Sequence, residues 1–341
     1  MSDRGAGYVG PVRDVAAVNP VDLRLEAYRG ELLGYCYRML GSAFEAEDAV
    51  QETMVRAWRG HDRFEGRSAL RSWLYRIATN VCYDHLNGRQ RRARPMDLGP
   101  AQPATTPRVP PPEPEAVWIN PIPDARVVPD GADPAEVAEA RESIRLAFIA
   151  ALQLLPPRQR AVLILRQVLR WKASEVAELL DTSVASVNSL MQRAKATLEA
   201  ADTTAGELAR PLDEDQQELL ARYVDAFERY DMDALTALLH DDATMSMPPI
   251  PLWLQGADQI VAWNLGHGKG CRGSRFVPAP AANGSPAYGQ YRPSGPGGRH
   301  EAWSLHVLDI RDERIARIEV FLDVERVFPL FGLPLRLDDE G

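Results

Sequence analysis

The chain has 341 residues, of which 45% are hydrophobic, and a formal net charge of −9. This length excludes a single typical domain and this hydrophobic content excludes a largely disordered protein, so two or three folded domains are expected. The three cysteines stand far apart without a CxxC pair, which indicates neither a disulfide framework nor a zinc site. No signal peptide and no apolar run of membrane-spanning length is present. We therefore predict a soluble, cytoplasmic protein without membrane segment, metal or cofactor.

The charge is distributed unevenly along the chain. Residues 1–95 and 135–200 carry net charges of +3 and +2, whereas residues 96–134 and 201–341 carry −4 and −10. Overall acidity argues against a nucleic-acid partner, but here it resides in the middle and C-terminal segments. The two mildly basic segments therefore stay candidates for nucleic-acid binding.

The N-terminal segment reads as a leader followed by three helices. Residues 1–20, rich in Gly and Pro, are predicted to be disordered, and residues 21–40 show the spacing of an amphipathic helix that Gly41 ends. Ser42 can cap the next helix, and a loop over residues 61–68, where Ser68 can act as a cap, separates it from the third. The apolar positions of the last two helices are Val50, Met54, Val55, Trp58, Leu70, Trp73, Leu74, Ile77, Ala78 and Val81.

The polar faces of these two helices differ in kind. The first carries acidic and amide groups, and the second contains a Trp and runs into a tail of arginines. This order resembles region 2 of bacterial sigma factors of the extracytoplasmic-function (ECF) class, here spanning residues 21–95. The resemblance implies that the first helix binds the clamp helices of the RNA polymerase β′ subunit and that the second reads the −10 promoter element as single strand. The polymerase-binding residues implied are Asp48, Gln51, Glu52 and Arg56, and the −10 residues are Phe64, Arg67, Trp73, Arg76 and Asn80.

The chemistry of these side chains suits single-stranded DNA. Aromatic rings and Arg planes stack on unpaired bases, amides read base edges, and Arg neutralises phosphates. An ordinary helical pair with a solvated basic face would show the same pattern, so this stretch alone leaves both interpretations open.

Residues 96–134 form a proline-rich linker. Twelve of the 27 prolines fall within residues 95–134, which excludes a regular helix or sheet across them. Inside it, residues 117–124 are unusually apolar, and such a patch in a linker indicates a docking site more often than an accidental cluster. It is also similar to a linker motif of sigma factors with an extra C-terminal domain. The regulatory residues predicted are Trp118, Ile119, Pro121, Ile122, Pro123 and Asp124.

Residues 135–200 are predicted to be helical and to end in a helix-turn-helix. One helix begins after Asp133 and continues to Leu152, a second spans residues 158–169, and residues 173–180 and 184–198 form the helix pair. Val184, Val187 and Leu190 are expected to pack inward, and Ser183 to cap the last helix. The segment resembles region 4 of the same sigma class, which binds the −35 element and the polymerase β flap. The −35 residues predicted are Ser186, Asn188, Ser189, Gln192 and Arg193.

Residues 211–335 change character to two helices followed by strands. Strands are predicted over 243–247, 275–282, 287–291, 301–311 and 315–324, with a short helix over 257–265. This order resembles the SnoaL-like, nuclear-transport-factor-like α+β cone with a curved antiparallel sheet. Such a cone could admit a small ligand, although core packing is the favoured role of its inward side chains and neither a catalytic dyad nor a metal set is apparent. The candidates are Tyr223, Met245, Met247, Trp253, Trp263, Trp303 and His306.

The fold class expected is therefore multidomain, with two all-α modules and a C-terminal α+β cone. The leading hypothesis is an alternative sigma factor that binds core RNA polymerase and promoter DNA, has no catalysis of its own, and is regulated in cis by the cone. The alternatives are a helix-turn-helix transcriptional regulator with a ligand-sensing C-terminal domain, and an enzyme housed in the cone.

Overall fold

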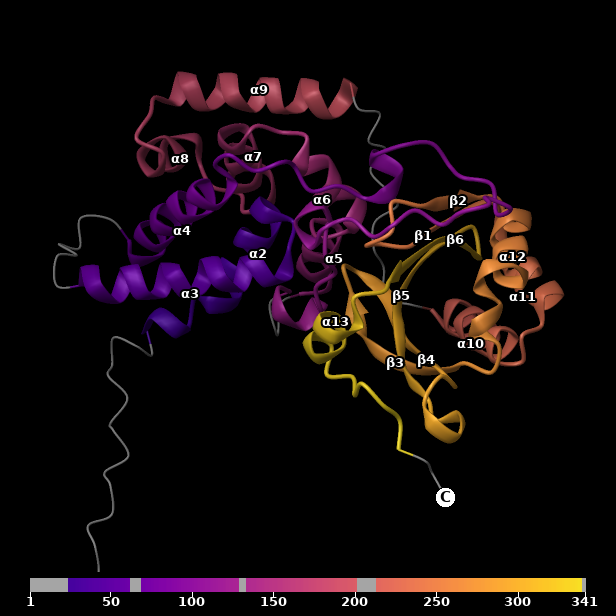
Figure 1. Cartoon of the computed structure of the whole chain (residues 1–341). Helices are drawn as coiled ribbons and strands as arrows, with labels where there is room; N and C mark the ends of the chain where they lie inside the picture. Colours follow the sequence, from indigo (N-terminus) through magenta and orange to yellow (C-terminus); the bar gives the residue numbers. More distant parts are fainter. Residues whose placement is uncertain (1–23, 62–68, 129–132, 201–212, 339–341) are drawn as a thin grey trace, which may run out of the picture.

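Three helices form the N-terminal part of the computed structural model, which describes residues 24–61, 69–128, 133–200 and 213–338 (Figure 1). They are α2 (Arg29–Leu40), α3 (Ala43–Gly60) and α4 (Leu70–Leu86). Gly41, with φ of 72°, ends α2, and the Ser42 hydroxyl accepts the Glu45 N–H at 3.4 Å to cap α3, as the sequence predicted. The predicted leader, residues 1–20, and residues 62–68 of the predicted loop lie outside the described residues.

The second helical part has more breaks than predicted. It comprises α5 (Pro134–Glu142), α6 (Leu146–Gln153), α7 (Pro157–Leu163), a π-helical turn (Ile164–Val168), α8 (Ala173–Leu179) and α9 (Val184–Ala200). The single helix expected through Leu152 is wrong. The carbonyls of Ser143 and Ile144 accept hydrogen bonds from Arg38 and Asn283 of other parts of the chain, so the helix is interrupted where tertiary partners replace helical ones.

The C-terminal part is an α+β domain with one six-stranded sheet. Three helices, α10 (Glu214–Glu228), α11 (Met232–Leu238) and α12 (Ala257–Leu265), cover one face (Figure 1). The strands are β1 (Leu239–Ser246), β2 (Trp253–Gln255), β3 (Arg275–Ala282), β4 (Ser285–Arg292), β5 (Glu301–Arg311) and β6 (Arg314–Phe321), in the order β2-β1-β6-β5-β4-β3. The all-antiparallel sheet predicted is wrong in one place, because β1 pairs parallel with β6. The strand expected to reach residue 324 ends at Phe321, before α13 (Val324–Leu330).

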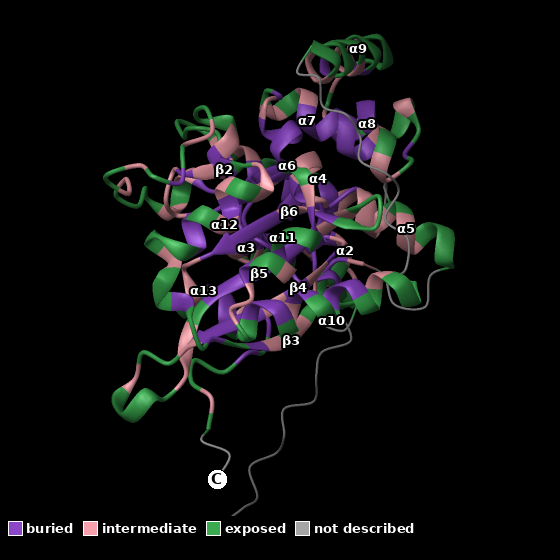
Figure 2. Cartoon of the chain, turned by 90° about the vertical axis from the view of Figure 1, so that its right-hand side faces the viewer, coloured by how far each residue is buried: buried purple, intermediate pink, exposed green. Residues whose placement is uncertain are grey.

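Buried apolar residues form two cores on opposite faces of this sheet. One core contains residues of α10, α11 and α12 together with Met245, Leu254 and Ile318. The other is continuous: it joins α2, α3, α4, α6 and α7 with Ile119 and Ile122 of the linker and with Val307 and Phe321 of the sheet. Figure 2 shows the strands largely buried while α9 is largely exposed. The helical part and the α+β domain are therefore packed as one body through the linker.

The linker contains no α-helix and no named strand over residues 95–128, in agreement with its proline content. Three 3₁₀ turns punctuate it, at Pro95–Asp97, Glu115–Val117 and Asp124–Arg126. It follows the α+β domain, where Gln102 N–H donates to the Trp253 carbonyl at 2.9 Å. The linker is therefore bound along its course rather than solvated. No helix within the described residues is long and apolar enough to cross a membrane.

Candidate functional site

The predicted polymerase-binding residues lie along the outer face of α3. Asp48, Gln51 and Arg56 are exposed, and the Arg56 guanidinium donates to Glu52 at 2.5 Å and to Asp84 of α4 at 3.1 Å. Trp58 and Val55 were expected among the apolar core positions. Instead, Trp58 is 59% exposed and Val55 is 41% exposed. An exposed Trp beside acidic and amide groups makes this a face suited to a protein partner.

The predicted −10 residues share one face of α4 at helical spacing. Trp73 is half-buried, and Arg76 and Asn80 are exposed. Phe64 and Arg67 lie outside the described residues. The face is not free, because the Arg76 guanidinium donates to the carbonyl of Glu178 in α8 at 2.9 Å.

Further contacts join α4 to the helix-turn-helix. The ring of Trp171, just before α8, lies 5.0 Å from the Tyr75 ring and 5.0 Å from the Arg71 guanidinium. Tyr75 and Trp171 are both buried. The two helical modules are therefore in direct contact through the element that the resemblance assigns to −10 reading.

The predicted −35 residues lie on α9, on the outer side of the molecule (Figure 1). The Ser183 hydroxyl accepts the Ser186 N–H at 3.1 Å and caps the helix, as predicted. Val187 is buried, but Val184, which was expected to pack inward, is 43% exposed. Ser186 is half-buried, whereas four residues with donors or acceptors are exposed: Asn188, Ser189, Gln192 and Arg193.

The predicted regulatory motif lies where all modules meet. Trp118, Ile119, Pro121, Ile122, Pro123 and Asp124 are all buried. On the helical side, the Asn120 N–H donates to the Gly41 carbonyl at 3.1 Å and the Tyr37 hydroxyl donates to the Asn120 carbonyl at 2.8 Å. On the domain side, Pro123 forms a β-bridge with Ala282.

Asn283 is the residue that joins these parts, and the sequence analysis did not single it out. Its side-chain oxygen accepts the Ile122 N–H at 2.9 Å, and its amide nitrogen donates to the Tyr37 hydroxyl at 2.7 Å and to the Ile144 carbonyl at 2.5 Å. One side chain thus contacts the linker and both helical modules while being 1% exposed. The signal in the sequence was Asn-Gly between two strands: Asn283 (φ 53°) and Gly284 (φ 76°) form the two-residue β3–β4 turn.

An ion pair strengthens the same junction. Asp309 of β5 lies 3.0 Å from Arg145, which precedes α6, and 3.1 Å from Arg317. Burial acts to raise the pKa of Asp309, but the two guanidinium groups prevail and hold it below its ordinary value. One acidic group of the α+β domain is thus paired with one basic group of the helical part at this point.

The interior of the α+β domain is packed with the side chains proposed as pocket candidates. Tyr223 and His306 are buried and hydrogen-bonded at 3.0 Å, and the other His306 nitrogen lies 3.0 Å from the Gln290 side-chain oxygen. Burial lowers the pKa of His306 to about 3, so the imidazole is neutral. Met245, Met247 and Trp263 are also buried, whereas Trp303 is 38% exposed and Trp253 half-buried. Within the described ranges, no three His, Cys, Asp or Glu residues are grouped to hold a metal.

Three family models match successive parts of the chain. Residues 25–92 match the model of Sigma-70 region 2, residues 145–198 that of Sigma-70, region 4, and residues 220–318 that of the SnoaL-like domain. The ECF RNA polymerase sigma factor SigG of Mycobacterium tuberculosis is 47% identical over 315 residues, covering 91% of this chain and 82% of SigG. The chain belongs to the ECF family of RNA polymerase sigma factors.

Other comparisons agree with this assignment. The ECF sigma factor SigJ of Mycobacterium tuberculosis is 27% identical over 322 residues, covering 91% of this chain and 93% of SigJ. The crystal structure of Mycobacterium tuberculosis SigJ is similar with a TM-score of 0.57 at 22% identity, over 92% of this chain and 99% of that one, which shows a shared fold. The fold class predicted is confirmed. As an ECF sigma factor, the protein directs promoter recognition and is not an enzyme.

Proposed function

We propose that this ECF sigma factor binds core RNA polymerase through α3 and the promoter −10 and −35 elements through α4 and α9. We further propose that the linker and the SnoaL-like domain restrain the two helical modules in cis. The observation that carries the second part is the set of hydrogen bonds made by Asn283, which connects the linker and both modules to the domain.

We call the arrangement in which α4 contacts α8 the closed form. In the closed form, the proposed DNA-binding faces of α4 and α9 lie too close together to reach both promoter elements. The names of the elements place them about 25 base pairs apart, which is about 85 Å along B-DNA at about 3.4 Å per base pair. Arg76 contacts Glu178, and the chain from Glu178 to Arg193 could span at most about 54 Å even if fully extended. Since α8 and α9 are helical, the real separation is smaller. Binding at both elements therefore requires α4 and α8 to separate.

The predicted polymerase and promoter surfaces differ in whether they are exposed in the closed form. The α3 face with Asp48 and Gln51, and the α9 face with Asn188 and Arg193, are exposed in the closed form. The α4 face is the one in contact, through Arg76. The expected consequence is a sigma factor that can meet polymerase while closed but engages the promoter only after opening.

The test is transcription in vitro with core RNA polymerase and the full-length protein. The protein should confer start-site selection on core enzyme and co-purify with it. Tight binding to free promoter duplex without any complex with polymerase would instead support the helix-turn-helix regulator. Restraint in cis is tested separately with Asn283→Gly, compared with Asp312→Gly in the β5–β6 turn. Asp312 also has positive φ, at 49°, and its ion-pair contacts are with His240 and Arg311 of the same domain.

A further inference from the structure

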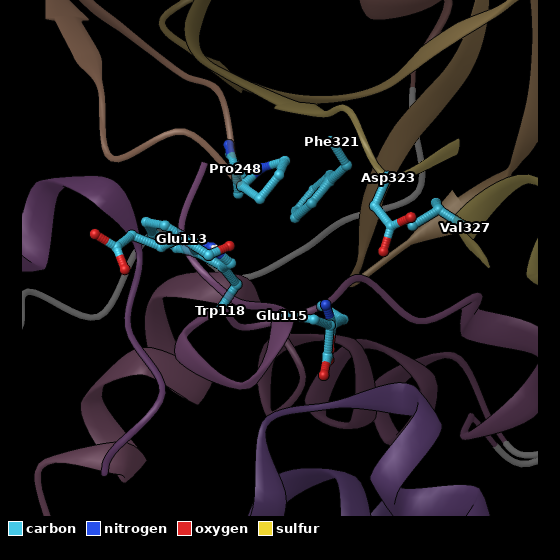
Figure 3. A pocket seen from close by; sticks show the side chains of 9 residues that line it. Glu113, Glu115, Trp118, Pro248, Phe321, Asp323 and Val327 are labelled. Atoms are coloured by element: carbon cyan, nitrogen blue, oxygen red, sulfur yellow. Dashed lines mark hydrogen bonds between the residues drawn. The ribbon is translucent and has the colours of Figure 1, made fainter. Parts of the chain in front are cut away.

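A cavity of about 130 Å³ lies where the linker meets the SnoaL-like domain, outside the domain's own core. Figure 3 shows its two sides: Trp118 and Glu115 come from the linker, and Phe321 and Asp323 from the end of β6 and the start of α13. A cavity of about 150 Å³ is known to hold benzene, which has six non-hydrogen atoms. The present space is slightly smaller but partly open, so it suits a trimethylammonium group whose short arm extends out through the opening.

Hydrogen bonds to backbone carbonyls hold both walls of this cavity in place. The Glu113 N–H donates to the Pro249 carbonyl at 2.8 Å, which ties the linker to the turn after β1. The Leu322 N–H donates to the Pro248 carbonyl at 2.9 Å, which ties that turn to β6. The buried Arg92 guanidinium donates to the Trp118 carbonyl from the helical side. The cavity is thus a built feature of the docked linker.

Its lining combines aromatic surface with negative charge. Trp118 is 2% and Phe321 5% exposed, and both border the space. Aromatic faces attract cations through their quadrupole, most strongly for Trp and in desolvated surroundings. Pro248 and Pro249 add apolar surface, and neither has a backbone N–H that could donate a hydrogen bond into the cavity.

Asp323 places a half-buried carboxylate on the domain side of the cavity. Within the described residues, no hydrogen bond or ion pair reaches its side chain. Burial raises the pKa of Asp323, and the charges of Glu115 and Glu325 raise it further against the opposing effect of Arg326. Arg326 is itself engaged elsewhere, 3.6 Å from Glu115 and 4.1 Å from the centre of the Phe44 ring. Glu115 is already paired, at 3.0 Å from Arg92 and 3.6 Å from Arg326, so Asp323 is the carboxylate that is open to a cation in the cavity.

We propose that this cavity binds a small organic cation, an ammonium compound of about the size of choline, between Trp118, Phe321 and Asp323. Because the linker and the domain each contribute a wall, the bound cation stabilises the docked linker by mass action. The site is distinct from promoter and polymerase surfaces, and its occupation can be measured on the free protein.

The experiment is calorimetric titration of the full-length protein with choline and with 3,3-dimethyl-1-butanol, which has the same shape without the charge. Choline is expected to bind about 10-fold more tightly than the neutral compound, the size of a desolvated cation–aromatic interaction. Asp323→Asn should weaken choline binding about 10-fold. The matched control is Glu325→Gln, which removes the same charge from an exposed position on α13 and should leave the affinity within about twofold.

Hydrogen exchange supplies the second measurement. Choline should slow exchange of the Ile119, Asn120 and Ile122 amides, whose hydrogen bonds hold the linker to Ala93, Gly41 and Asn283. Equal binding of the two compounds, an equal loss in both variants, or no saturable binding to the native protein would each overturn the proposal. None of these results depends on whether the linker controls transcription, so failure here leaves the proposed function to its own test.

Discussion

Replacement of Asn283 by Gly should open the closed form of this sigma factor without damaging the turn that carries it. Both residues of the β3–β4 turn have positive φ, which Gly adopts readily, so a Gly-Gly turn keeps the hairpin. The substitution removes three hydrogen bonds to other parts of the chain, at 2.9, 2.7 and 2.5 Å.

The size of the effect can be worked from these bonds. Each contributes about 1 kcal/mol net, and loss of the Asn283 side chain also leaves the Ile122 N–H and the Ile144 carbonyl without this partner. A total of about 3 kcal/mol shifts the ratio of closed to open protein by about 100-fold. The radius of gyration should increase, and less sigma factor should be needed for half-maximal transcription.

The assay is run-off transcription at increasing sigma concentration, paired with small-angle scattering of the free protein. Asp312→Gly serves as the control, since it places Gly in the other long hairpin, away from the linker. Unchanged transcription together with unchanged scattering, in an Asn283→Gly protein that still folds, would show that this residue does not hold the modules together. Reduced transcription with an expanded particle would show that the domain assists rather than restrains.

Three further predictions concern other parts of the molecule. Ile122→Ala, at a fully buried position of the linker, should cost about 3 kcal/mol and speed hydrogen exchange over residues 118–124; unchanged protection there would contradict its docking role. Arg193→Ala should weaken promoter binding by about 1–3 kcal/mol and reduce by about 1 the slope of log affinity against log salt concentration. Arg170→Ala removes the same charge outside α9 and should have neither effect; equal effects of the two substitutions would indicate general charge attraction only. The pKa of buried His306 is lowered to about 3, so below about pH 6.5 the unfolded chain binds more protons than the folded protein, and stability is lost as the pH falls. Between pH 7.5 and 5 the free energy of unfolding should drop by about 2 kcal/mol, as measured in denaturant titrations. A similar drop in His306→Gln would assign the effect to other groups.

Much of the local structure was determined by the sequence alone. Caps at Ser42 and Ser183 lie where predicted, because a cap depends on a side chain and a backbone only three residues apart. The proline-rich segment excluded regular structure for the same local reason, and the residues of its apolar motif are buried.

Features that depend on distant partners needed the tertiary structure. The break between α5 and α6 arises because Arg38 and Asn283 take up carbonyls that a continuous helix would use. The exposure of Trp58 and the parallel pairing of β1 with β6 likewise follow from which surfaces meet, a choice that periodicity does not encode. Roles for Asp48 on α3 and Arg193 on α9 stay predictions, although both side chains are exposed as these roles require.

The junction itself shows the division most clearly. Asn-Gly between strands specifies a tight turn, since both residues tolerate positive φ. That the Asn283 side chain then reaches Tyr37, Ile122 and Ile144, residues separated from it by 246, 161 and 139 positions, was decided only when the folded modules packed together. Side-chain hydrogen bonds of this range depend on the position of whole domains, and no local pattern in a chain records that position.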